Sequence, residues 1–216
     1  MLNEGDHFCG LRASFVTELL TPARPRLCRW FLANETLNLP TPEVRAALKA
    51  AAGAWPKVAN VRVEEVLVEE QADLVIRCVD LGGPYGVLAD CELPGPKVQH
   101  MRLDSTESWV VHLGQDVPAN LIDLYRVAVH EWGHAWGMGH APQGSPNLMS
   151  PTYSRSIWVP QGWERDQMVR GYGPPPPAPE PPVVPSEPPE AMVKWIAALD
   201  AAGATLAKYE VLRRVA

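Results

Sequence analysis

The stretch of sequence that decides the fold of this chain runs from His130 to His140 and reads His-Glu-Trp-Gly-His-Ala-Trp-Gly-Met-Gly-His. His130 and His134 stand four residues apart, so on a helix their side chains project from one face, a turn apart. Gly137 favours the positive φ of a turn in which the chain leaves the helix. That turn brings His140 back toward the other two histidines. The stretch therefore predicts a helix whose end carries three converging imidazoles.

Converging imidazoles at this spacing predict a catalytic zinc site. Neutral histidines ligate zinc, and three protein ligands leave the fourth tetrahedral position open, whereas a structural zinc site has four protein ligands. Glu131 directly follows the first ligand and is placed to act as general base on a zinc-activated water. A chance match to the five fixed letters is expected on the order of 10⁻⁵ times per chain of this length. We therefore predict that His130, His134 and His140 bind zinc and that Glu131 is catalytic.

Length and charge limit the classes of protein to which the chain can belong. Its 216 residues suffice for one domain with a sizeable core and an appendage. The net charge of -6 comes from scattered side chains, which predicts no nucleic-acid partner. Apolar runs stay short of the roughly 20 residues that span a bilayer, so no membrane span is expected. Residues 1–10 lack the apolar segment of a signal peptide, which leaves the compartment open between an exported and an intracellular protein.

The four cysteines, Cys9, Cys28, Cys78 and Cys91, do not have the spacing of a zinc knuckle. An even number permits two disulfides, and buried free thiols fit the same positions equally well. The sequence leaves both states open.

Hydrophobic periodicity and turn residues predict the elements around the zinc motif. Strands are expected at residues 27–33, 58–68, 74–79, 87–93 and 109–113, and helices at 41–55, 121–136 and 163–170. The helix at 41 has Thr41 as its expected N-cap and Pro42 at its first position, and Pro56 is expected to end it. This order predicts an α+β fold, layered as in α/β proteins, with helices against a sheet.

Composition divides the chain into four parts. Residues 1–26 form a polar N-terminal extension, and 27–173 form the expected catalytic domain. Residues 174–189 are rich in proline and are expected to be a semi-rigid linker. Residues 190–216 are expected to form a separate amphipathic helix, which is too small to bury its own apolar face. We expect this tail helix to dock, to self-associate or to bind a partner; a frayed tail is the alternative.

The zinc motif and the later segment Asn147-Leu148-Met149-Ser150-Pro151 together resemble the matrixins, a group within the metzincin zinc peptidases. The resemblance extends over residues 27–173. It implies a metzincin-like fold: a twisted, mostly parallel sheet of about five strands with an antiparallel edge strand, an active-site helix and a C-terminal helix. It also implies zinc-dependent hydrolysis of protein or peptide substrates and suggests an extracellular location.

The same resemblance implies roles for residues outside the zinc motif. Met149 is similar to the methionine that lies beneath the zinc as an apolar floor. Pro151 and Tyr153 match the wall of the main specificity pocket, S1′, which receives the side chain after the cleaved bond. Residues 83–89 resemble the loop and edge strand that pair with substrate, which implies substrate contacts for Leu88, Ala89 and Asp90.

Two departures from the family concern metals. Asp90 and Arg102 stand where matrixins carry two histidines of a second, structural zinc site, so we expect that site to be absent. Asp104 and Glu107 match two carboxylates of a family calcium site, while Gly82 replaces a third. Carboxylates suit calcium, but two carboxylates on a surface turn are often simply solvated, so both interpretations remain open.

Cys9-Gly10 is loosely similar to the segment whose cysteine keeps matrixin zymogens latent by ligating zinc. The arginine and the Pro-Asp pair that surround that cysteine are missing here. The sequence therefore favours a structural or incidental role for Cys9.

These observations predict a zinc-dependent endopeptidase that cleaves extended protein substrates through a zinc-activated water, with Glu131 as general base. The alternative is a catalytically inactive, zinc-containing module that binds peptides and is tethered by the C-terminal helix. The intact Glu131 favours the enzyme.

Overall fold

A computed structural model describes residues 8–10, 25–34, 36–112, 117–118, 121–142 and 145–177. The chain divides into two compact units, Met1–Pro176 and Pro177–Ala216. The predicted tail helix at 190–216 and most of the linker at 174–189 lie outside the described residues, so both stay predictions. Within the described residues, no helix is long and apolar enough to cross a membrane.

The described unit is built on a mixed sheet of six strands in the order β1-β5-β6-β4-β2-β3. The strands are β1 (Phe8–Cys9), β2 (Leu27–Leu32), β3 (Arg62–Glu65), β4 (Leu74–Val79), β5 (Val87–Cys91) and β6 (Gln99–Asp104). All neighbours are parallel except β5 and β6, which are antiparallel. The predicted α+β fold with one antiparallel strand near the edge is therefore confirmed.

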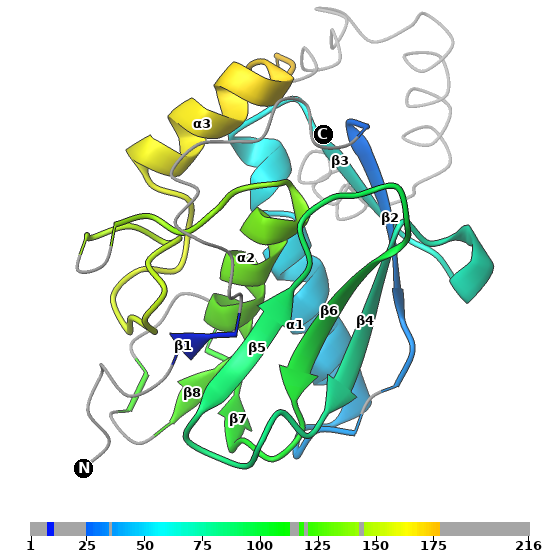
Figure 1. Cartoon of the computed structure of the whole chain (residues 1–216), viewed down its shortest axis with the longest axis vertical. Coiled ribbons are helices and arrows are strands. Elements are labelled where there is room, and N and C mark those ends of the chain that lie inside the picture. Colours follow the sequence, from blue (N-terminus) through cyan, green and yellow to red (C-terminus); the bar gives the residue numbers. More distant parts are fainter. Residues whose placement is uncertain are drawn as a thin grey trace, which may run out of the picture. The chain divides into compact units, whose positions relative to one another are not determined.

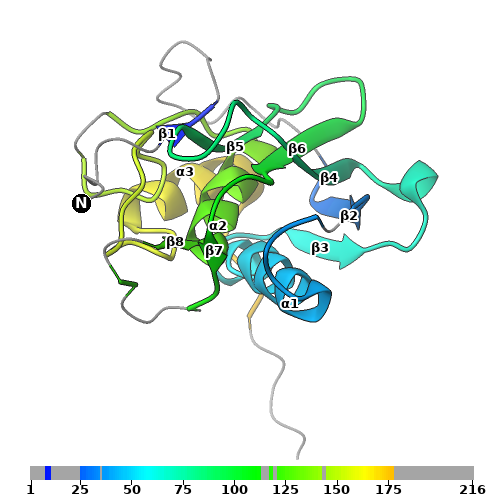
Figure 2. The same ribbon diagram turned by 90° about the horizontal axis from the view of Figure 1, so that it is seen from below.

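Helices α1 (Thr41–Ala52) and α2 (Leu124–Ala135) pack against each other on one face of this sheet, as Figures 1 and 2 show. A short parallel pair, β7 (Trp109–Val110) and β8 (Ile122–Asp123), leads directly into α2. Helix α3 (Gly162–Tyr172) follows the loop after the zinc motif. The zinc motif thus lies on the central helix of the layer.

Strand β6 is the longest described element that the sequence did not predict. It pairs with β4 over six registered residues and with β5 on its other side. Its residues alternate between buried Gln99, Met101 and Leu103 and the less buried His100 and Arg102. Polar residues in this segment make it look unlike a buried strand in the sequence. In the fold, Arg102 pairs with Asp90 of β5 on the sheet surface, a contact that the sequence does not show.

Three boundaries in the sheet and in α1 differ from the predicted ones. The N-cap of α1 is Pro40 rather than Thr41, and no side chain caps it. The helix ends at Ala52, and Pro56 lies in a separate 3₁₀ turn, Trp55–Lys57, instead of ending α1. Strand β3 covers 62–65 only, because residues 66–68 turn away into a second 3₁₀ turn, Glu69–Gln71.

Helix α2 is buried along its whole length. Each of its twelve residues is buried, and Trp132 packs edge-on against Trp30 of β2 with ring centroids 6.3 Å apart. Helical periodicity by itself indicates one buried stripe on such a helix, because polar residues on the other faces look solvent-facing when the tertiary contacts are unknown. Asp123 begins the helix as N-cap, its carboxylate accepting the Tyr125 N–H at 3.2 Å.

The four cysteines are thiols rather than disulfides, and Cys28, Cys78 and Cys91 are buried. Of the two states that the sequence left open, the structure has the thiols. The fourth, Cys9, is half-buried in β1, which joins the sheet beside β5 (Figure 1). Part of the predicted N-terminal extension therefore belongs to the sheet.

Candidate metal centre

The three predicted zinc ligands converge at the C-terminal end of α2. The Nε2 atoms of His130 and His134 are 3.0 Å apart, and those of His134 and His140 are 3.2 Å apart. Each of the first two rings faces a carbonyl with its other nitrogen: His130 Nδ1 lies 2.7 Å from Leu148 O, and His134 Nδ1 lies 2.7 Å from Met138 O. A carbonyl can only accept, so both Nδ1 atoms carry the proton and both Nε2 atoms carry a lone pair.

This arrangement fits a zinc ion. Two lone pairs 3.0 Å apart repel each other, and a cation between them removes the repulsion. Tetrahedral zinc with Zn–N bonds of 2.0–2.1 Å places its ligand nitrogens roughly 3.3 Å apart, close to the observed separations. Burial lowers the pKa of His130 to about 3 and also lowers the pKa values of His134 and His140. The imidazoles are therefore neutral at physiological pH, which is the form that binds metal.

The turn at Gly137 positions the third histidine, His140. Its φ is 93°, in the left-handed region that glycine enters without steric cost. Its N–H donates to His134 O at 2.8 Å, and the Met138 N–H donates to Gly133 O at 3.0 Å, which together close the end of α2. The predicted turn at Gly137 is confirmed, and it points His140 back at His134.

Met149 lies under the active-site helix, as the family resemblance implied. It is fully buried, and a Cβ added to Gly133 would approach its Sδ to 2.3 Å. The turn is held by Glu164 of α3, whose buried carboxylate accepts the Met149 N–H at 3.0 Å and the Gln161 N–H at 2.9 Å. The sequence analysis missed Glu164, although Gln161 and Glu164 carry the spacing of a capping box.

Glu131 faces the metal ligands from the same helix. Its side chain is buried, and desolvation raises its pKa to about 8, against the lowering effect of a hydrogen bond from Cys9. The Cys9 Sγ lies 3.6 Å from Glu131 Oε2. A carboxyl group with a pKa near neutrality can both take up and release a proton at physiological pH.

Cys9, for which the sequence favoured a structural or incidental role, lies beside the three predicted zinc ligands. Its Sγ is 3.4 Å from His134 Nε2, and it forms with the three histidines a group whose ligand atoms all lie within 4.8 Å of one another. Zinc–sulfur and zinc–nitrogen bonds of 2.3 and 2.0–2.1 Å put the two ligand atoms roughly 3.5 Å apart. The thiol therefore stands where a fourth ligand would stand.

The backbone around Cys9 occupies a cleft between β5 and the segment after the methionine turn. The Cys9 N–H donates to Pro151 O at 3.1 Å, and the Gly10 N–H donates to Ala89 O at 2.8 Å. An extended segment is thus held by backbone hydrogen bonds on both sides, which is how a cleft binds peptides of varied sequence. Two of the predicted substrate-contacting residues, Ala89 and Pro151, make these bonds.

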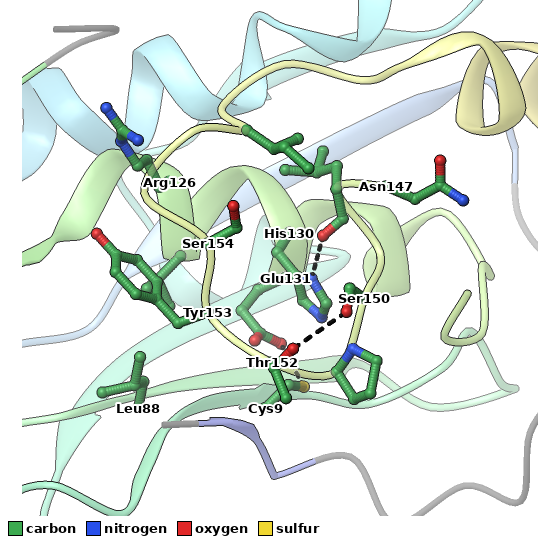
Figure 3. Close-up of a pocket in the computed structure, with 14 residues that line it drawn as sticks. Cys9, Leu88, Arg126, His130, Glu131, Asn147, Ser150, Thr152, Tyr153 and Ser154 are labelled. Carbon is green, nitrogen blue, oxygen red and sulfur yellow. Dashed lines mark hydrogen bonds between the residues drawn. The ribbon is translucent and has the colours of Figure 1, made fainter. Parts of the chain in front are cut away.

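A pocket opens beside this cleft (Figure 3). It is lined by Cys9, Leu88, Arg126, Val127, His130, Glu131, Asn147, Leu148, Ser150, Pro151, Thr152, Tyr153, Ser154 and Ile157. The predicted residues Leu88, Pro151 and Tyr153 are among them. Ala89 and Asp90 are not, and Asp90 instead pairs with Arg102. The sequence analysis missed Arg126, which no local motif distinguishes from an ordinary surface arginine on a helix.

Four residues stand at positions of the family's other two metal sites. Asp90 and Arg102 face each other across β5 and β6, and Arg102 Nε donates to Asp90 Oδ1 at 2.8 Å. Asp104 and Glu107 are both buried rather than solvated, with exposures of 0% and 3%. Asp104 Oδ1 accepts the Thr106 N–H at 2.8 Å, while Oδ2 has no hydrogen-bond partner within the described residues.

The metzincin class of zinc proteins is defined by a group of three histidines with an adjacent glutamate. The group lies on a helix packed against a mixed sheet, above a buried methionine turn. The chain belongs to the matrixin family (Peptidase M10), whose sequence profile matches residues 24–161. Matrixins are zinc metalloendopeptidases, and membership supports that general class of hydrolase for this chain.

Individual relatives agree with this assignment. The chain is 32% identical to the interstitial collagenase of Equus caballus over 160 residues, which cover 67% of this chain and 32% of that protein. It is 30% identical to stromelysin-1 of Rattus norvegicus over 169 residues, covering 72% of this chain and 34% of that protein. The chain thus spans about a third of the length of these relatives.

Proposed function

We propose that the chain is a zinc endopeptidase that hydrolyses peptide bonds of extended protein substrates, with His130, His134 and His140 as zinc ligands. The observation that carries the proposal is the convergence of two Nε2 lone pairs at 3.0 Å beside the buried Glu131. The two lone pairs suit a bound cation, and Glu131 beside them suits a proton acceptor.

The residues of the chain have distinct parts in this reaction. Zinc, when bound, supplies the Lewis acidity that activates a water molecule and polarises a carbonyl. Glu131 takes the proton of the attacking water and passes it to the leaving amine. The carbonyls of Ala89 and Pro151 align the substrate backbone, as they align residues 9 and 10 in the structure.

The Cys9 segment lies across the same groups, so in this form of the chain it competes with substrate. We propose that the Cys9 thiolate is a fourth zinc ligand and that the peptidase is latent until the segment leaves. The 3.4 Å separation of Cys9 Sγ and His134 Nε2 supports this role, as does the pairing of Gly10 with Ala89.

We also propose that Asp104 and Glu107 hold a calcium ion. Burying a carboxylate without a partner is costly, and the buried, unpartnered Asp104 Oδ2 within the described residues calls for a cation. Calcium accepts such oxygens together with backbone carbonyls. The loop at 82–86 lies against Glu107, whose carboxylate accepts the Tyr85 N–H.

Substrates are proposed to be proteins or peptides, and an extracellular site of action is proposed from the family. The expected docking, self-association or partner binding of the helix at 190–216 stays a proposal, which a size comparison of the whole chain with one ending at Pro177 would test. Identical apparent association states would exclude self-association through the tail.

Replacing Glu131 with alanine tests the mechanism. We expect Glu131→Ala to retain one zinc per chain, since the three histidines remain, and to lose at least about 10³-fold in kcat/KM because the proton acceptor is gone. Cleavage of a denatured casein substrate and zinc content are measured in the same samples. Both are repeated in the Cys9→Ala background, so that latency does not hide the difference.

The outcomes separate the enzyme from the inactive peptide-binding module. The enzyme predicts chelator-sensitive cleavage by the chain with Glu131 and none by Glu131→Ala. The module predicts zinc content and casein binding without cleavage in either chain. Undiminished cleavage by Glu131→Ala would exclude Glu131 as the general base.

A further inference from the structure

Strand β3 is the outer strand of the sheet, at the edge opposite β1 (Figure 2). The N–H groups of Arg62 and Val66 donate to backbone carbonyls on the β2 side, at 2.6 and 2.9 Å. The backbone groups of successive strand residues point to alternate sides, so those of Val63 and Glu65 point away from β2. Among the described residues, no strand pairs with this outer side. The edge of β3 can therefore accept a further strand.

A cavity of about 440 Å³ is lined by residues of β3 and its flank, of the neighbouring β2 and of α1. Its apolar surface comes from the buried Trp30 and Ala52, from Val63 and from Leu67. Leu67 is 84% exposed, more than any other large apolar side chain in the described part of the chain. An apolar cavity of about 150 Å³ holds one benzene ring, so this one has room for a large apolar side chain. We call the cavity and the outer edge of β3 the β3–α1 groove.

Two cations and one carboxylate complete the lining of the β3–α1 groove. Arg45 and Lys49 stand four residues apart on α1 and therefore share a helix face. Arg45 is paired with Glu65 of β3. Lys49 is exposed and forms no ion pair with another described residue. The groove thus has one net positive charge on a chain whose net charge is -6, and Lys49 suits a carboxylate from outside.

The position of these groups defines the occupant that the groove fits. An extended peptide satisfies the outward N–H and C=O groups of Val63 and Glu65, which a helix cannot do because its own backbone groups are already bonded. Side chains two residues apart in an extended chain project to one face. A segment with an apolar residue and an acidic residue two positions apart can therefore fill the cavity and reach Lys49 at once.

We propose that the β3–α1 groove binds an extended segment of a partner protein in which an apolar residue and an acidic residue stand two positions apart. The segment adds a strand to β3, its apolar side chain enters the cavity and its carboxylate pairs with Lys49. The groove lies at the sheet edge opposite β1 and β5, which border the proposed substrate cleft. The interaction therefore needs neither zinc nor Glu131, and it goes beyond the proposed function.

The probe is a fluorescein-labelled peptide, Ser-Thr-Phe-Thr-Asp-Thr-Phe-Thr-Ser. Its phenylalanines stand two residues to either side of the aspartate, so the peptide serves both strand directions. A matched probe has lysine in place of aspartate. Fluorescence anisotropy is measured with the whole chain in the Glu131→Ala background, and mass spectrometry verifies that the probe stays intact. We expect the aspartate probe to bind at least about tenfold more tightly than the lysine probe, since Lys49 attracts one and repels the other.

Reversing the charge of Lys49 should reverse this preference. Lys49→Glu is expected to bind the lysine probe more tightly than the aspartate probe, and the exposed position of residue 49 lets the variant fold. Lys97→Glu is the matched control, because Lys97 is also exposed, gives the same change in net charge and does not line the groove. This control should keep the preference of the parent chain.

The addition of a strand is tested separately. Val63→Pro removes the outward N–H of residue 63 and leaves the bonds between β3 and β2, so it should weaken binding of the aspartate probe by at least about tenfold. Two probes that are N-methylated on alternate sets of residues cover the case in which proline prevents folding. One of them should bind like the parent probe and the other at least about tenfold more weakly, because only every second N–H of the probe faces β3.

Several results would overturn the proposal. They are absence of binding up to about 1 mM chain, a preference that Lys49→Glu leaves unreversed or that Lys97→Glu reverses equally, and equal binding of both N-methylated probes. A dimer that Val63→Pro dissociates in analytical ultracentrifugation would make a second copy the occupant. Binding only by a chain ending at Pro177 would make residues 178–216 the occupant. None of these measurements uses cleavage, so a failure of the proposed peptidase is seen separately.

Discussion

At the scale of single residues, Cys9 lies against the proposed catalytic groups. Its sulfur is 3.4 Å from His134 and 3.6 Å from Glu131, so it contacts a metal ligand and the proposed base at once. Gly10 assists because it has no side chain: a Cβ there would lie 2.7 Å from Val87 Cγ1 and 3.2 Å from Asp90 Cβ. A side chain at position 10 would therefore require Val87 to shift.

Replacing Cys9 with alanine should activate the chain. The three histidines still hold zinc, and the position of the thiol becomes available to water and substrate. We expect kcat/KM on a peptide substrate to rise by at least about tenfold, since a competing contact reduces the fraction of competent molecules. Initial rates and zinc content are measured side by side.

Two further variants serve as comparisons for Cys9→Ala. Gly10→Ala retains the thiol but crowds Val87, so it should also raise activity, by less than Cys9→Ala. Cys91→Ala removes a buried thiol of β5 away from the metal group and should give no increase. An increase confined to Cys91→Ala, or none in any variant, would exclude the proposed latency.

At the scale of elements, helix α2 connects the core to the chemistry. Its whole length is buried, so the packing holds His130 and His134, the two proposed ligands on this helix, in fixed positions. Its C-terminal end is closed by the turn at Gly137, and Tyr172 of α3 donates its hydroxyl to Trp136 O at 2.9 Å. The end of one helix is thereby fixed by another, and with it the position of His140.

Replacing Gly137 with alanine should weaken the metal site. The residue has φ 93°, and a left-handed residue with a Cβ costs about 1–2 kcal/mol. We expect a loss of that size in the free energy of unfolding, measured by denaturant titration, and about a tenfold loss in zinc affinity because His140 is displaced. Competition with a chromogenic chelator measures the affinity.

Gly162→Ala is the control for this prediction. Gly162 begins α3, and an added Cβ there meets no atom within 4 Å. Alanine is the better helix former, so this variant should be as stable as the parent or slightly more stable, with unchanged zinc affinity. Equal zinc affinity in Gly137→Ala and the parent would contradict the role of the turn.

At the scale of the whole molecule, the metal site joins segments that are distant in sequence. Cys9 comes from the first strand, His130 and His134 from the central helix, and His140 from the turn that follows. A cation bound by all of them ties these segments together. Zinc should therefore stabilise the folded state as a whole, because the unfolded chain does not hold the ligands at these distances.

Removing zinc should lower the melting temperature. Free zinc at about 10³ times its Kd contributes about 4 kcal/mol, which for a domain of this size corresponds to roughly 10 °C. Differential scanning calorimetry with a zinc-selective chelator, followed by zinc alone, measures the loss and its recovery. His134→Ala should show little response to either addition, and a full response there would place the stabilising zinc elsewhere.

Calcium is tested in the same experiment. If Asp104 and Glu107 hold calcium, adding it after zinc gives a second rise in the melting temperature, which Asp104→Asn abolishes. The absence of a second rise would exclude a calcium site that stabilises the fold.

Much of this protein follows from local sequence. The spacing of His130, His134 and His140 is a property of one helix and one turn, and Gly137 marks that turn by its freedom to adopt positive φ. Strand β4 and helix α2 were also predicted near their observed bounds, because apolar runs and helical periodicity depend on neighbours in the chain.

Contacts between distant segments were decided only by the tertiary structure. Strand β6 carries Arg102, whose partner Asp90 lies on β5, so the local pattern of β6 does not reveal the strand. Cys9 reaches the metal group because β1 pairs with β5, and the two stand about 80 residues apart in sequence. Arg126 became part of the pocket through Asp123 and Trp158, which bury its charge. Local sequence determined which residues could bind zinc. Long-range packing decided that Cys9 lies beside them and that Arg126 lines the neighbouring pocket.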